Sequence, residues 1–326
     1  MDTPIPENWD EEADVIIIGS GFAGLAAAIE AKNAGASVVI LEKMKGYGGN
    51  STISDGVIAA AGTTLQEKYE IQDSAQLMYS DMMKAGLGLN HPELVKTVAE
   101  KSGETFQWTV DYLGVQYIER VRQFGGHTVP RGHIPQKGAG AAIVRQLLSK
   151  VISTGMSIRT KTYLKKVFRD SDNRVCGVLV QERYVYPDEN SGVQKYIKAK
   201  KAVILATGGF ANDIDFRSMH DPQLDETVDS TNKYSTTGES LREAMRINAM
   251  PVHLSRIQLG PWSTPDEKGY GIGPFFLSYA VFPYGIVVNP KTGLRVVNEL
   301  GDRKTRCDVI LQTGHPCIGI ADSKGV

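Results

Sequence analysis

The sequence predicts an α/β fold built on a parallel sheet, and three consecutive features near its start lead to that prediction. Residues 15–18 form an unbroken β-branched run, as expected of a parallel strand that is buried on both faces. An alanine-rich helix is predicted for about residues 22–33, between a glycine-rich turn and Gly35. A second apolar strand at residues 38–41 completes a strand–helix–strand unit.

The glycines of the turn stand at a Gly-x-Gly-x-x-Gly spacing, which has a mechanical reason. Gly19 permits the tight turn, Gly21 lets a pyrophosphate approach the backbone, and Gly24 lets the helix pack close to the strand. The helix start offers free N–H groups and the positive end of its dipole to phosphates. Glu42 ends the second strand, about where an acid accepts the ribose hydroxyls of a dinucleotide. We therefore predict a dinucleotide site; the alternative is a tight turn that binds no ligand.

Length and composition limit the class of protein. The 326 residues suffice for one large or two medium domains. The 36 basic and 37 acidic residues balance, so the charge favours neither nucleic acid nor an anionic membrane as a partner. Cys176, Cys307 and Cys317 are scattered and form no C-x-x-C motif, so we expect no metal site and no haem attachment. No run is long enough for a membrane span, no signal peptide is apparent, and residues 1–13 are typical of a linker.

Three further glycine-rich places extend the predicted ligand site. In residues 43–52, glycines alternate with small polar residues, which suits a loop that wraps the diphosphate; an ordinary flexible loop is the alternative. A buried strand at residues 202–205 runs into a Thr-Gly-Gly turn, which we expect on the far side of the same cleft. Gly238 precedes a helix at residues 240–248, whose start offers another place for phosphate or ring oxygens.

The middle of the chain is predicted to form helices that are followed by a turn of unusual composition. Residues 74–113 are predicted to be helical, with Asn90 as the cap of a helix whose first turn holds Pro92. The methionines of this stretch are expected to fill the core. Residues 124–133 place two histidines and an arginine in a glycine-rich turn, which we interpret as a loop near the cofactor or substrate, or as a surface turn. For His133 we expect the surface turn.

From about residue 254 the composition shifts to proline, glycine and aromatic residues, and we place a domain boundary there. The chain then divides into a linker, 1–13, a dinucleotide-binding domain, 14–254, and a second domain, 255–326. Further elements are predicted as a helix from near residue 140, a strand at 175–181, a polar hairpin at 183–200, a strand at 285–289 that turns at 291–293 and returns at 295–297, a helix entered through 298–306, and a strand at 317–326.

Five stretches together resemble the flavoprotein subunits of the fumarate reductase and flavocytochrome c family, above all its urocanate-reductase-like and other 2-enoate reductase branches. They read GSGFAGLAAAIEAKNAGASVVILEKM, GGNSTISDG, GGHTVPRGH, VILATGGFA and NELGDRK, and they spread over nearly the whole chain. The resemblance implies an α/β fold with a Rossmann-like FAD-binding domain and an inserted α+β capping domain that closes over the flavin. It implies FAD rather than NAD as the cofactor. Residues 14–254 would be the N-terminal portion of the FAD-binding domain, and residues 255–326 an incomplete capping domain.

The resemblance also carries site residues over, position by position. The positions that match FAD-contacting motifs of the family are Gly19, Gly21, Phe22, Ala23, Gly24, Glu42, Lys43, Met44, Gly49, Asn50, Ser51, Gly56, Ala206, Thr207, Gly208 and Gly238.

Arg303, which follows Glu299 by four residues, matches the arginine that acts as proton donor in that family. The chemistry asks for such a group, because hydride transfer from reduced flavin to one alkene carbon leaves the partner carbon carbanion-like. A cation beside the carboxylate offsets the developing enolate charge and can supply the proton, if a relay reloads it. The alternative for Arg303 is a salt bridge with Glu299 or Asp302 at the start of a helix.

The chain departs from the fumarate reductase pattern in three ways. Gln258 is followed by Leu-Gly-Pro-Trp where those enzymes carry a substrate-binding histidine, which disfavours fumarate itself. Residues 275–284 contain neither the acid nor the base of the family's proton relay, and Tyr279 or Tyr284 is expected to substitute. The family's C-terminal part, with a further histidine and arginine, is absent, so we expect either a fragment or a second polypeptide that supplies it.

We therefore expect an FAD-dependent oxidoreductase that acts on CH–CH bonds and reduces an α,β-unsaturated carboxylate of the urocanate or acrylate type. A haem or FMN domain, or a separate protein, would deliver the electrons, as in anaerobic respiration. The location would be periplasmic if the chain is a domain of a bacterial respiratory reductase. Fumarate reductase proper, a 3-ketosteroid Δ1-dehydrogenase-like enzyme and an inactive FAD-binding fragment are the alternatives.

Overall fold

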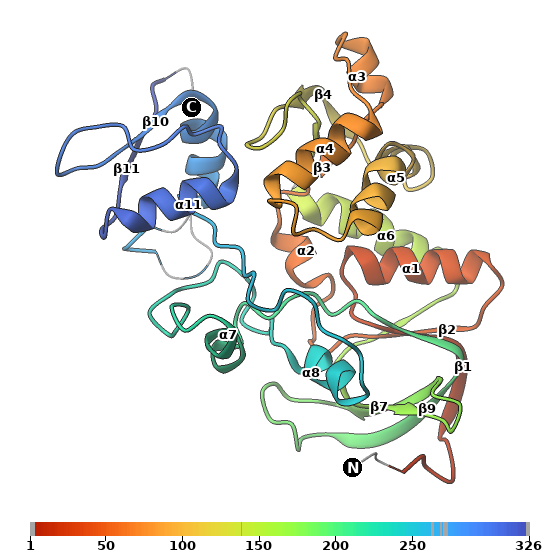
Figure 1. Ribbon diagram of the computed structural model, residues 1–326. Coiled ribbons are helices and arrows are strands. Elements are labelled where there is room, and N and C mark those ends of the chain that lie inside the picture. The colour runs from red at the N-terminus through yellow and green to blue at the C-terminus, as the bar shows by residue number, and fades with distance from the viewer. Residues whose placement is uncertain (1–3, 138, 262–263, 268, 270–272, 324–326) are drawn as a thin grey trace. The chain divides into compact units, whose positions relative to one another are not determined.

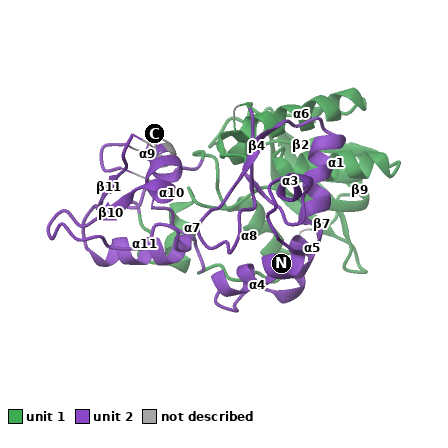
Figure 2. Ribbon diagram, turned by 90° about the horizontal axis from the view of Figure 1, so that it is seen from above, with its two compact units in different colours: residues 1–56, 137–225, 233–255 green, residues 57–136, 226–232, 256–326 purple. Residues whose placement is uncertain are grey.

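The computed structural model describes residues 4–137, 139–261, 264–267, 269 and 273–323, and the chain forms two compact units. Unit 1 comprises Met1–Gly56, Lys137–Asp225 and Lys233–Ser255. Unit 2 comprises Val57–Gln136, Glu226–Asn232 and Arg256–Val326 (Figure 2). The predicted division into a linker, an FAD-binding domain and a capping domain stays a prediction.

Unit 1 is built on a six-stranded sheet with the strand order β6-β2-β1-β9-β8-β7. Strands β1, β2, β7 and β9 of this sheet are labelled in Figure 1. The central strand β1 pairs in parallel with β2 on one side and with β9 on the other, as its β-branched sequence predicts. Ile16 and Ile17 are fully buried within it. The strands are β1 (Glu11–Ile18), β2 (Val38–Leu41), β6 (Ile158–Arg159), β7 (Thr162–Arg169), β8 (Val175–Glu182) and β9 (Val193–Leu205).

Two strands differ from the prediction in extent. β1 begins at Glu11, because Glu11–Ala13 already pair with residues 197–199 of β9. β9 is one strand of 13 residues, where we expected a hairpin arm and a separate strand. Its first half pairs with β8 in an antiparallel ladder and its second half pairs with β1 in a parallel one, so a single strand joins both parts of the sheet.

The helices of unit 1 include α1, which spans the predicted residues, Phe22–Asn33, and ends before Gly35, whose φ is +80°. The others are α2 (Gly49–Ile53), α6 (Ala139–Ser153), α7 (Ile214–His220) and α8 (Glu239–Arg246). Polar side chains fasten α8 to β7. The carboxylate of Glu243 accepts from the Val167 N–H at 2.5 Å, and the Arg246 guanidinium donates to the Val167 carbonyl at 2.9 Å.

Unit 2 contains two small sheets and several helices. The three-stranded sheet has the order β3-β5-β4, and β10 pairs antiparallel with β11. The strands are β3 (Ile58–Ala59), β4 (Tyr117–Arg122), β5 (Gly132–Pro135), β10 (Ile286–Val288) and β11 (Ile318–Ile320). The helices are α3 (Thr64–Lys68), α4 (Ala75–Ala85), α5 (Pro92–Asp111), α9 (Gly273–Phe276), the π-helical η1 (Leu277–Val281), α10 (Phe282–Tyr284) and α11 (Arg303–Gln312).

Helices α4 and α5 confirm the prediction for residues 74–113, but the predicted cap is wrong. His91 is the N-cap of α5, and Pro92 is its first residue. The Asn90 side chain instead donates to the Met82 carbonyl at 3.1 Å, at the end of α4. Because the amide closes the preceding helix, it is not available to start the next one. Met78 is 4% exposed and packs in a small core with Ala61 and Ala99, as expected.

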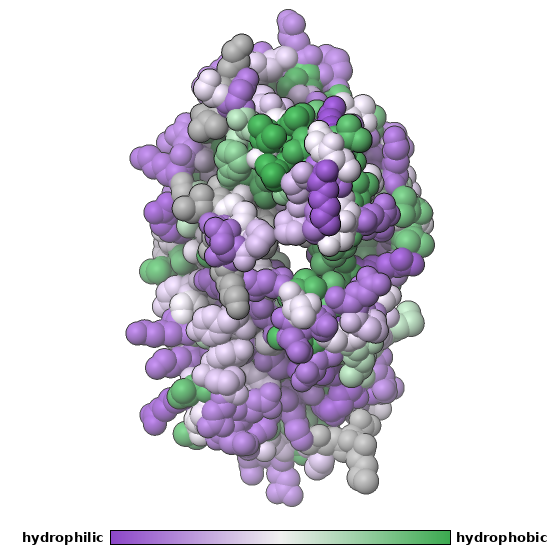
Figure 3. Space-filling view, turned by 90° about the vertical axis from the view of Figure 1, so that its left-hand side faces the viewer, coloured by the Kyte–Doolittle hydropathy of each residue, from purple (hydrophilic) through white to green (hydrophobic). Residues whose placement is uncertain are grey.

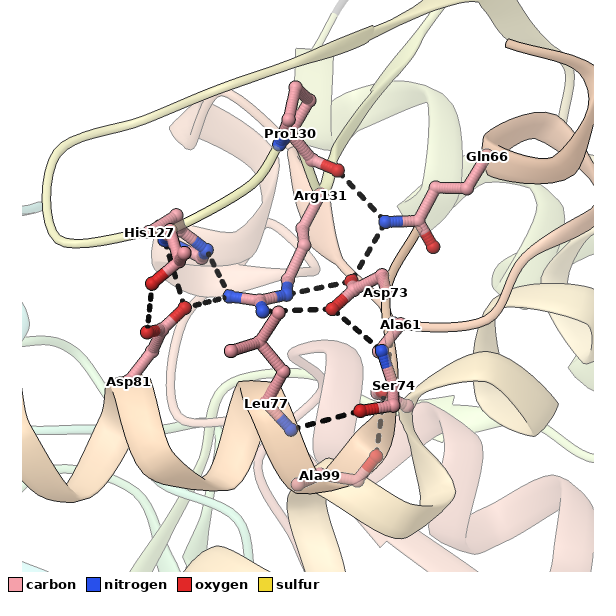
Figure 4. Close-up of polar contacts among 12 residues, drawn as sticks. Ala61, Gln66, Asp73, Ser74, Leu77, Asp81, Ala99, His127, Pro130 and Arg131 are labelled. Atoms are coloured by element: carbon pink, nitrogen blue, oxygen red, sulfur yellow. Dashed lines mark hydrogen bonds and ion pairs between the residues drawn. The ribbon is translucent and has the colours of Figure 1, made fainter. Parts of the chain in front are cut away.

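The glycine-rich turn at residues 124–133 leads into the core of unit 2. Arg131 is completely buried and donates to both carboxylate oxygens of Asp73 at 2.8 Å, and to Asp81 at 2.5 Å (Figure 4). His133 is also completely buried, with Nδ1 3.2 Å from the Ile58 carbonyl and Nε2 2.9 Å from the Thr63 hydroxyl. The surface turn that we expected for His133 is therefore wrong, because the next strand, β5, carries this side chain inward.

Unit 2 also exposes large apolar side chains, and apolar side chains gather in the upper half of the face drawn in Figure 3. Those exposed within residues 276–320 are Phe276, Tyr284, Ile286, Leu294, Leu300, Leu311, Ile318 and Ile320. Among the described residues, no helix has the length and hydropathy that crossing a membrane would require.

Candidate functional site: a dinucleotide cradle in unit 1

The turn from β1 into α1 brings three backbone segments to contact distance. Gly19 has a φ of +104°, and a Cβ at this position would lie 2.3 Å from the carbonyl oxygen of Ala206. A Cβ at Gly24 would lie 1.9 Å from the carbonyl oxygen of Gly19. Neither position has room for a side chain, so both glycines are required by close packing. The Ala206 N–H donates to the Ile18 carbonyl at 2.8 Å and holds the end of β9 beside the turn.

The start of α1 faces the loop that follows β2. Gly21 is the N-cap and provides no side chain, while the Phe22 N–H donates to the Ser51 hydroxyl at 3.0 Å. A Cβ at Gly21 would lie 3.1 Å from that same oxygen. Ala23 is exposed in the first turn of the helix. The predicted loop therefore folds back onto the positive end of α1, the place where a diphosphate binds in this kind of turn.

Glu42 is held in place by the turn that it faces. Glu42 is 8% exposed, and its carboxylate accepts from the Ser20 hydroxyl at 2.6 Å, the Ser20 N–H at 3.2 Å and the Met44 N–H at 2.9 Å. These bonds use three of the roughly four acceptor sites of a carboxylate, which leaves capacity for a hydroxyl donor. Ser20 also accepts from the Gly48 N–H at 3.0 Å, so one buried serine ties the turn, the acid and the following loop together.

Lys43 points to another part of unit 1. Its ammonium group donates to the Ser235 carbonyl at 2.9 Å and the Thr237 hydroxyl at 2.7 Å, and it forms an ion pair with Glu239 at 3.2 Å. It also lies 5.4 Å from the centre of the Tyr186 ring. The three donors of the ammonium are therefore engaged, and Lys43 fixes residues 235–239 beside the end of β2.

Asn50 makes a second link to the same region. Its amide donates to the Thr236 hydroxyl at 3.0 Å, and its oxygen accepts from the Lys233 N–H at 2.8 Å. Gly49, just before it, has a φ of +48° and open space where a Cβ would be. The structure thus places Gly49, Asn50 and Ser51 between α1 and residues 233–237.

Two predicted glycines owe their identity to packing. Gly56 has a φ of +67°, and its Cβ would lie 2.5 Å from the Gly140 nitrogen at the start of α6. Gly238 is buried, and its N–H donates to the Asp213 carboxylate at 3.0 Å. Asp213 therefore takes the N–H of the N-cap residue of α8, and the role of this helix start in holding phosphate or ring oxygens stays a prediction. Thr207 and Gly208 are exposed after β9, with open space at the Cβ position of Gly208.

Sequence reasoning missed several side chains that hold the cradle together. They are Ser20, Tyr186, Asp213, Thr236, Thr237 and Glu239. Ser20 stands between two of the motif glycines, so its position was a usable signal. The others are distant in sequence from their partners, and no local pattern identifies them.

Arg303 belongs to unit 2, where it is the first residue of α11. Its guanidinium donates to the Gln258 side-chain oxygen at 3.3 Å. The two acids expected as alternative partners of Arg303 also make other contacts. Asp302 is the N-cap and accepts from the Thr305 N–H at 3.0 Å, and Glu299 pairs with Arg295.

The arrangement in unit 1 fits a dinucleotide, because glycines line the strand–helix turn and a buried acid stands at the end of the next strand. The family model of the FAD binding domain matches residues 14–320. The chain belongs to this FAD-binding family. FAD is therefore the cofactor of the domain, as predicted, and the contacts of individual residues with it stay predictions.

Two curated relatives and one solved structure show the range of the similarity. The acrylate reductase flavoprotein subunit of Shewanella woodyi is 42% identical over 306 residues, which are 93% of this chain and 60% of the relative. The urocanate reductase of Eggerthella lenta is 31% identical over 257 residues, 78% of this chain and 41% of the relative. The open conformation of a flavocytochrome c3 fumarate reductase matches with a TM-score of 0.78 and 29% identity, over 93% of this chain and 51% of that one.

These matches confirm the predicted family and the mixed α/β fold of the FAD-binding domain. The chain spans from about two fifths to three fifths of the length of the relatives that it matches.

Proposed function

We propose that the protein is an FAD-dependent oxidoreductase that reduces the carbon–carbon double bond of an α,β-unsaturated carboxylate of the acrylate or urocanate type. The observation that carries the proposal is the 42% identity with an acrylate reductase flavoprotein subunit across 93% of this chain. The replacement of the expected histidine after Gln258 by Leu-Gly-Pro supports a mono-carboxylic enoate over fumarate.

When bound, FAD supplies the hydride for one carbon of the double bond. The residues of unit 1 serve to bind and orient the cofactor. The turn at Gly19–Gly24 and the start of α1 suit the diphosphate, and Glu42 suits a ribose hydroxyl.

We propose Arg303 as the residue that donates the proton to the second carbon. At the first position of α11 its backbone is fixed by the Asp302 cap, and its guanidinium is held by Gln258. A fixed cation beside a carboxylate lowers the cost of the enolate-like charge that develops as the hydride arrives. An arginine has too high a pKa to release a proton to water at neutral pH, so the transfer requires the carbanion-like carbon as acceptor.

Electrons would reach the protein from a haem or FMN domain or from a separate donor protein. This part of the proposal rests on relatives that are described as a flavoprotein subunit and as a cytochrome-linked reductase.

Anaerobic reoxidation of the reduced flavin tests the proposal. The FAD-loaded protein is reduced and mixed in turn with acrylate, methacrylate, urocanate, cinnamate and fumarate, and the return of flavin absorbance is followed by stopped flow. Fast reoxidation by acrylate or urocanate is expected. Reoxidation by none of the five would refute enoate reduction.

The role of Arg303 is tested in the same assay with Arg303→Ala and, as a control, Lys304→Ala. Lys304 is the neighbouring cation, exposed and paired with Asp308. We expect Arg303→Ala to slow reoxidation by about 100-fold or more, as for the loss of a general acid, and Lys304→Ala to leave it unchanged. Equal rates for Arg303→Ala and the unmodified protein would exclude Arg303 as proton donor and favour a tyrosine-based steroid dehydrogenase.

A further inference from the structure

A short aromatic segment of unit 2 is contacted by arginines from other elements. The segment consists of η1 and α10, residues 277–284, and a π-helical turn of this kind is often found at a functional site. The Arg306 guanidinium from α11 lies 4.1 Å from the centre of the Phe282 ring. The Arg122 guanidinium from β4 lies 5.2 Å from the centre of the Tyr279 ring.

Arg306 is a buried cation, and one of its N–H donors lacks an acceptor in the described part of the chain. The residue is 6% exposed. Its Nε is buried and has no hydrogen-bond acceptor among the residues that the structure describes. Burial also lowers the pKa of the Arg306 guanidinium, and Cys307 and Asp302 oppose this only in part. Within the same described part of the chain, Nε and Nη1 of Arg122 are buried and unpaired as well. Buried donors on a cation are costly to leave unpaired, so this pattern points to an anion.

The acids closest to Arg306 in the chain are already engaged. Asp302 caps α11 through Thr305, and Asp308 pairs with Lys304. Glu299 accepts from the Val287 N–H at 2.7 Å and pairs with Arg295. None of these hydrogen bonds and ion pairs involves the Arg306 guanidinium, so we infer that a ligand supplies the acceptor for its unpaired Nε.

The stacking on Phe282 defines which kind of anion suits Arg306. A cation–π contact uses the flat face of the guanidinium and leaves its N–H groups pointing outward in the plane. Two such N–H groups match the two oxygens of a carboxylate in a bidentate pair. Arg306 also stands three residues after Arg303, so both side chains leave the same face of α11.

We propose that Arg306 binds the carboxylate of the enoate substrate, with the Phe282 ring holding its guanidinium in the receiving orientation. This assignment rests on the proposed function, since it names the residue that would anchor the substrate beside Arg303. It separates two tasks on one helix face: Arg306 binds the carboxylate, and Arg303 delivers the proton.

The test measures binding apart from turnover. Isothermal titration calorimetry on the oxidised, FAD-loaded protein gives Kd for propionate, a saturated carboxylate, and for propionamide, its neutral counterpart. The variants are Arg306→Gln and, as a matched loss of one positive charge on the same helix, Lys304→Gln. Arg306→Gln is expected to weaken propionate binding by about 30-fold or more and to leave propionamide binding unchanged, and Lys304→Gln to change neither.

Steady-state reduction of acrylate adds a second readout. With Arg306→Gln, KM for acrylate should rise by a similar factor, and kcat should also fall, because the carboxylate that the residue binds takes up the enolate-like charge as the hydride arrives. If Arg306→Gln does not retain FAD, Phe282→Leu takes its place, since it keeps the cation and removes its aligning ring. The expected loss of propionate affinity is then about fivefold.

The outcomes separate the two proposals. Unchanged propionate affinity in Arg306→Gln and in Phe282→Leu would overturn the role of Arg306, and so would a protein that does not distinguish propionate from propionamide. Arg306-dependent propionate binding in a protein that reduces no enoate would support the carboxylate site and refute the proposed reaction.

Discussion

Substitution of Gly24 by alanine tests the close packing on which the cradle depends. The new methyl carbon would lie 1.9 Å from the Gly19 carbonyl oxygen and 3.3 Å from the Ala206 methyl group. Contacts between such atoms are favourable only near about 3.5 Å, so α1 and the turn must separate by roughly 1.5 Å. A carbonyl oxygen of the main chain cannot rotate away as a side chain can. Overpacking of this kind costs about 3 kcal/mol and displaces the helix start from the position that suits a diphosphate.

The measurements are the FAD content of the purified protein and its thermal unfolding midpoint. We expect Gly24→Ala to retain little FAD and to unfold roughly 6–12 °C below the unmodified protein, from about 2–4 °C for each kcal/mol. Gly46→Ala is the matched control, because a Cβ at Gly46 meets nothing within 4 Å and its φ is not in the left-handed region. Full FAD occupancy with an unchanged Tm in Gly24→Ala would show that the turn can open at no cost, against this reasoning.

Two further substitutions probe Glu42 and His133. Glu42→Gln exchanges one acceptor oxygen for an amide NH2 group that faces N–H and O–H donors, so the affinity for FAD should fall about 10-fold or more. A fluorescence titration of the apoprotein with FAD measures this affinity, and the variant of an exposed residue, Glu30→Gln, should bind FAD normally. Equal affinities of Glu42→Gln and the unmodified protein would exclude Glu42 from cofactor binding. Burial lowers the pKa of His133 in the folded protein. Below about pH 6.5 the unfolded chain therefore binds a proton at this histidine that the folded protein does not bind. The free energy of unfolding then falls as the pH falls from about 6.5 toward the folded pKa, by up to about 1.4 kcal/mol per pH unit. Denaturant unfolding between pH 7.5 and 5.5 should therefore show a flatter pH dependence for His133→Asn than for the unmodified protein or the exposed control His253→Asn, and identical slopes would contradict the assignment.

The sequence alone determines the strand–helix–strand unit, because its signals are local. A β-branched run, glycines at a defined spacing and an apolar run ending in Glu42 each act within a few residues. The requirement for glycine at positions 19 and 24 can therefore be predicted before the fold is known. In the structure, a Cβ at either position would clash with a backbone carbonyl oxygen. The same local character explains the agreement for α1, α4 and α11 and for the helical span of α5, because hydrophobic periodicity acts within the segment itself, whereas the cap of α5 was predicted one residue too early.

Contacts between distant residues were decided only by the tertiary structure. Lys43 pairs with Glu239, 196 residues away, and Arg131 pairs with Asp73, 58 residues away. No local pattern encodes such partners, since they depend on how strands and helices pack. The burial of His133 is of the same kind, because a glycine-rich turn predicts exposure until the pairing of β5 with β3 turns the side chain inward.

Arg306 shows most clearly what only the fold decides. In the sequence it is one cation among several at the start of a helix, beside Arg303 and Lys304. The structure buries it against Phe282 and leaves its Nε without an acceptor in the described part of the chain, while Lys304 stays exposed and paired. The helical period puts Arg303 and Arg306 on one face, but burial on that face depends on residues 277–284, which come from elsewhere in the chain. Charge and spacing are properties of the sequence, whereas the desolvation that makes a charge require a partner arises only from packing.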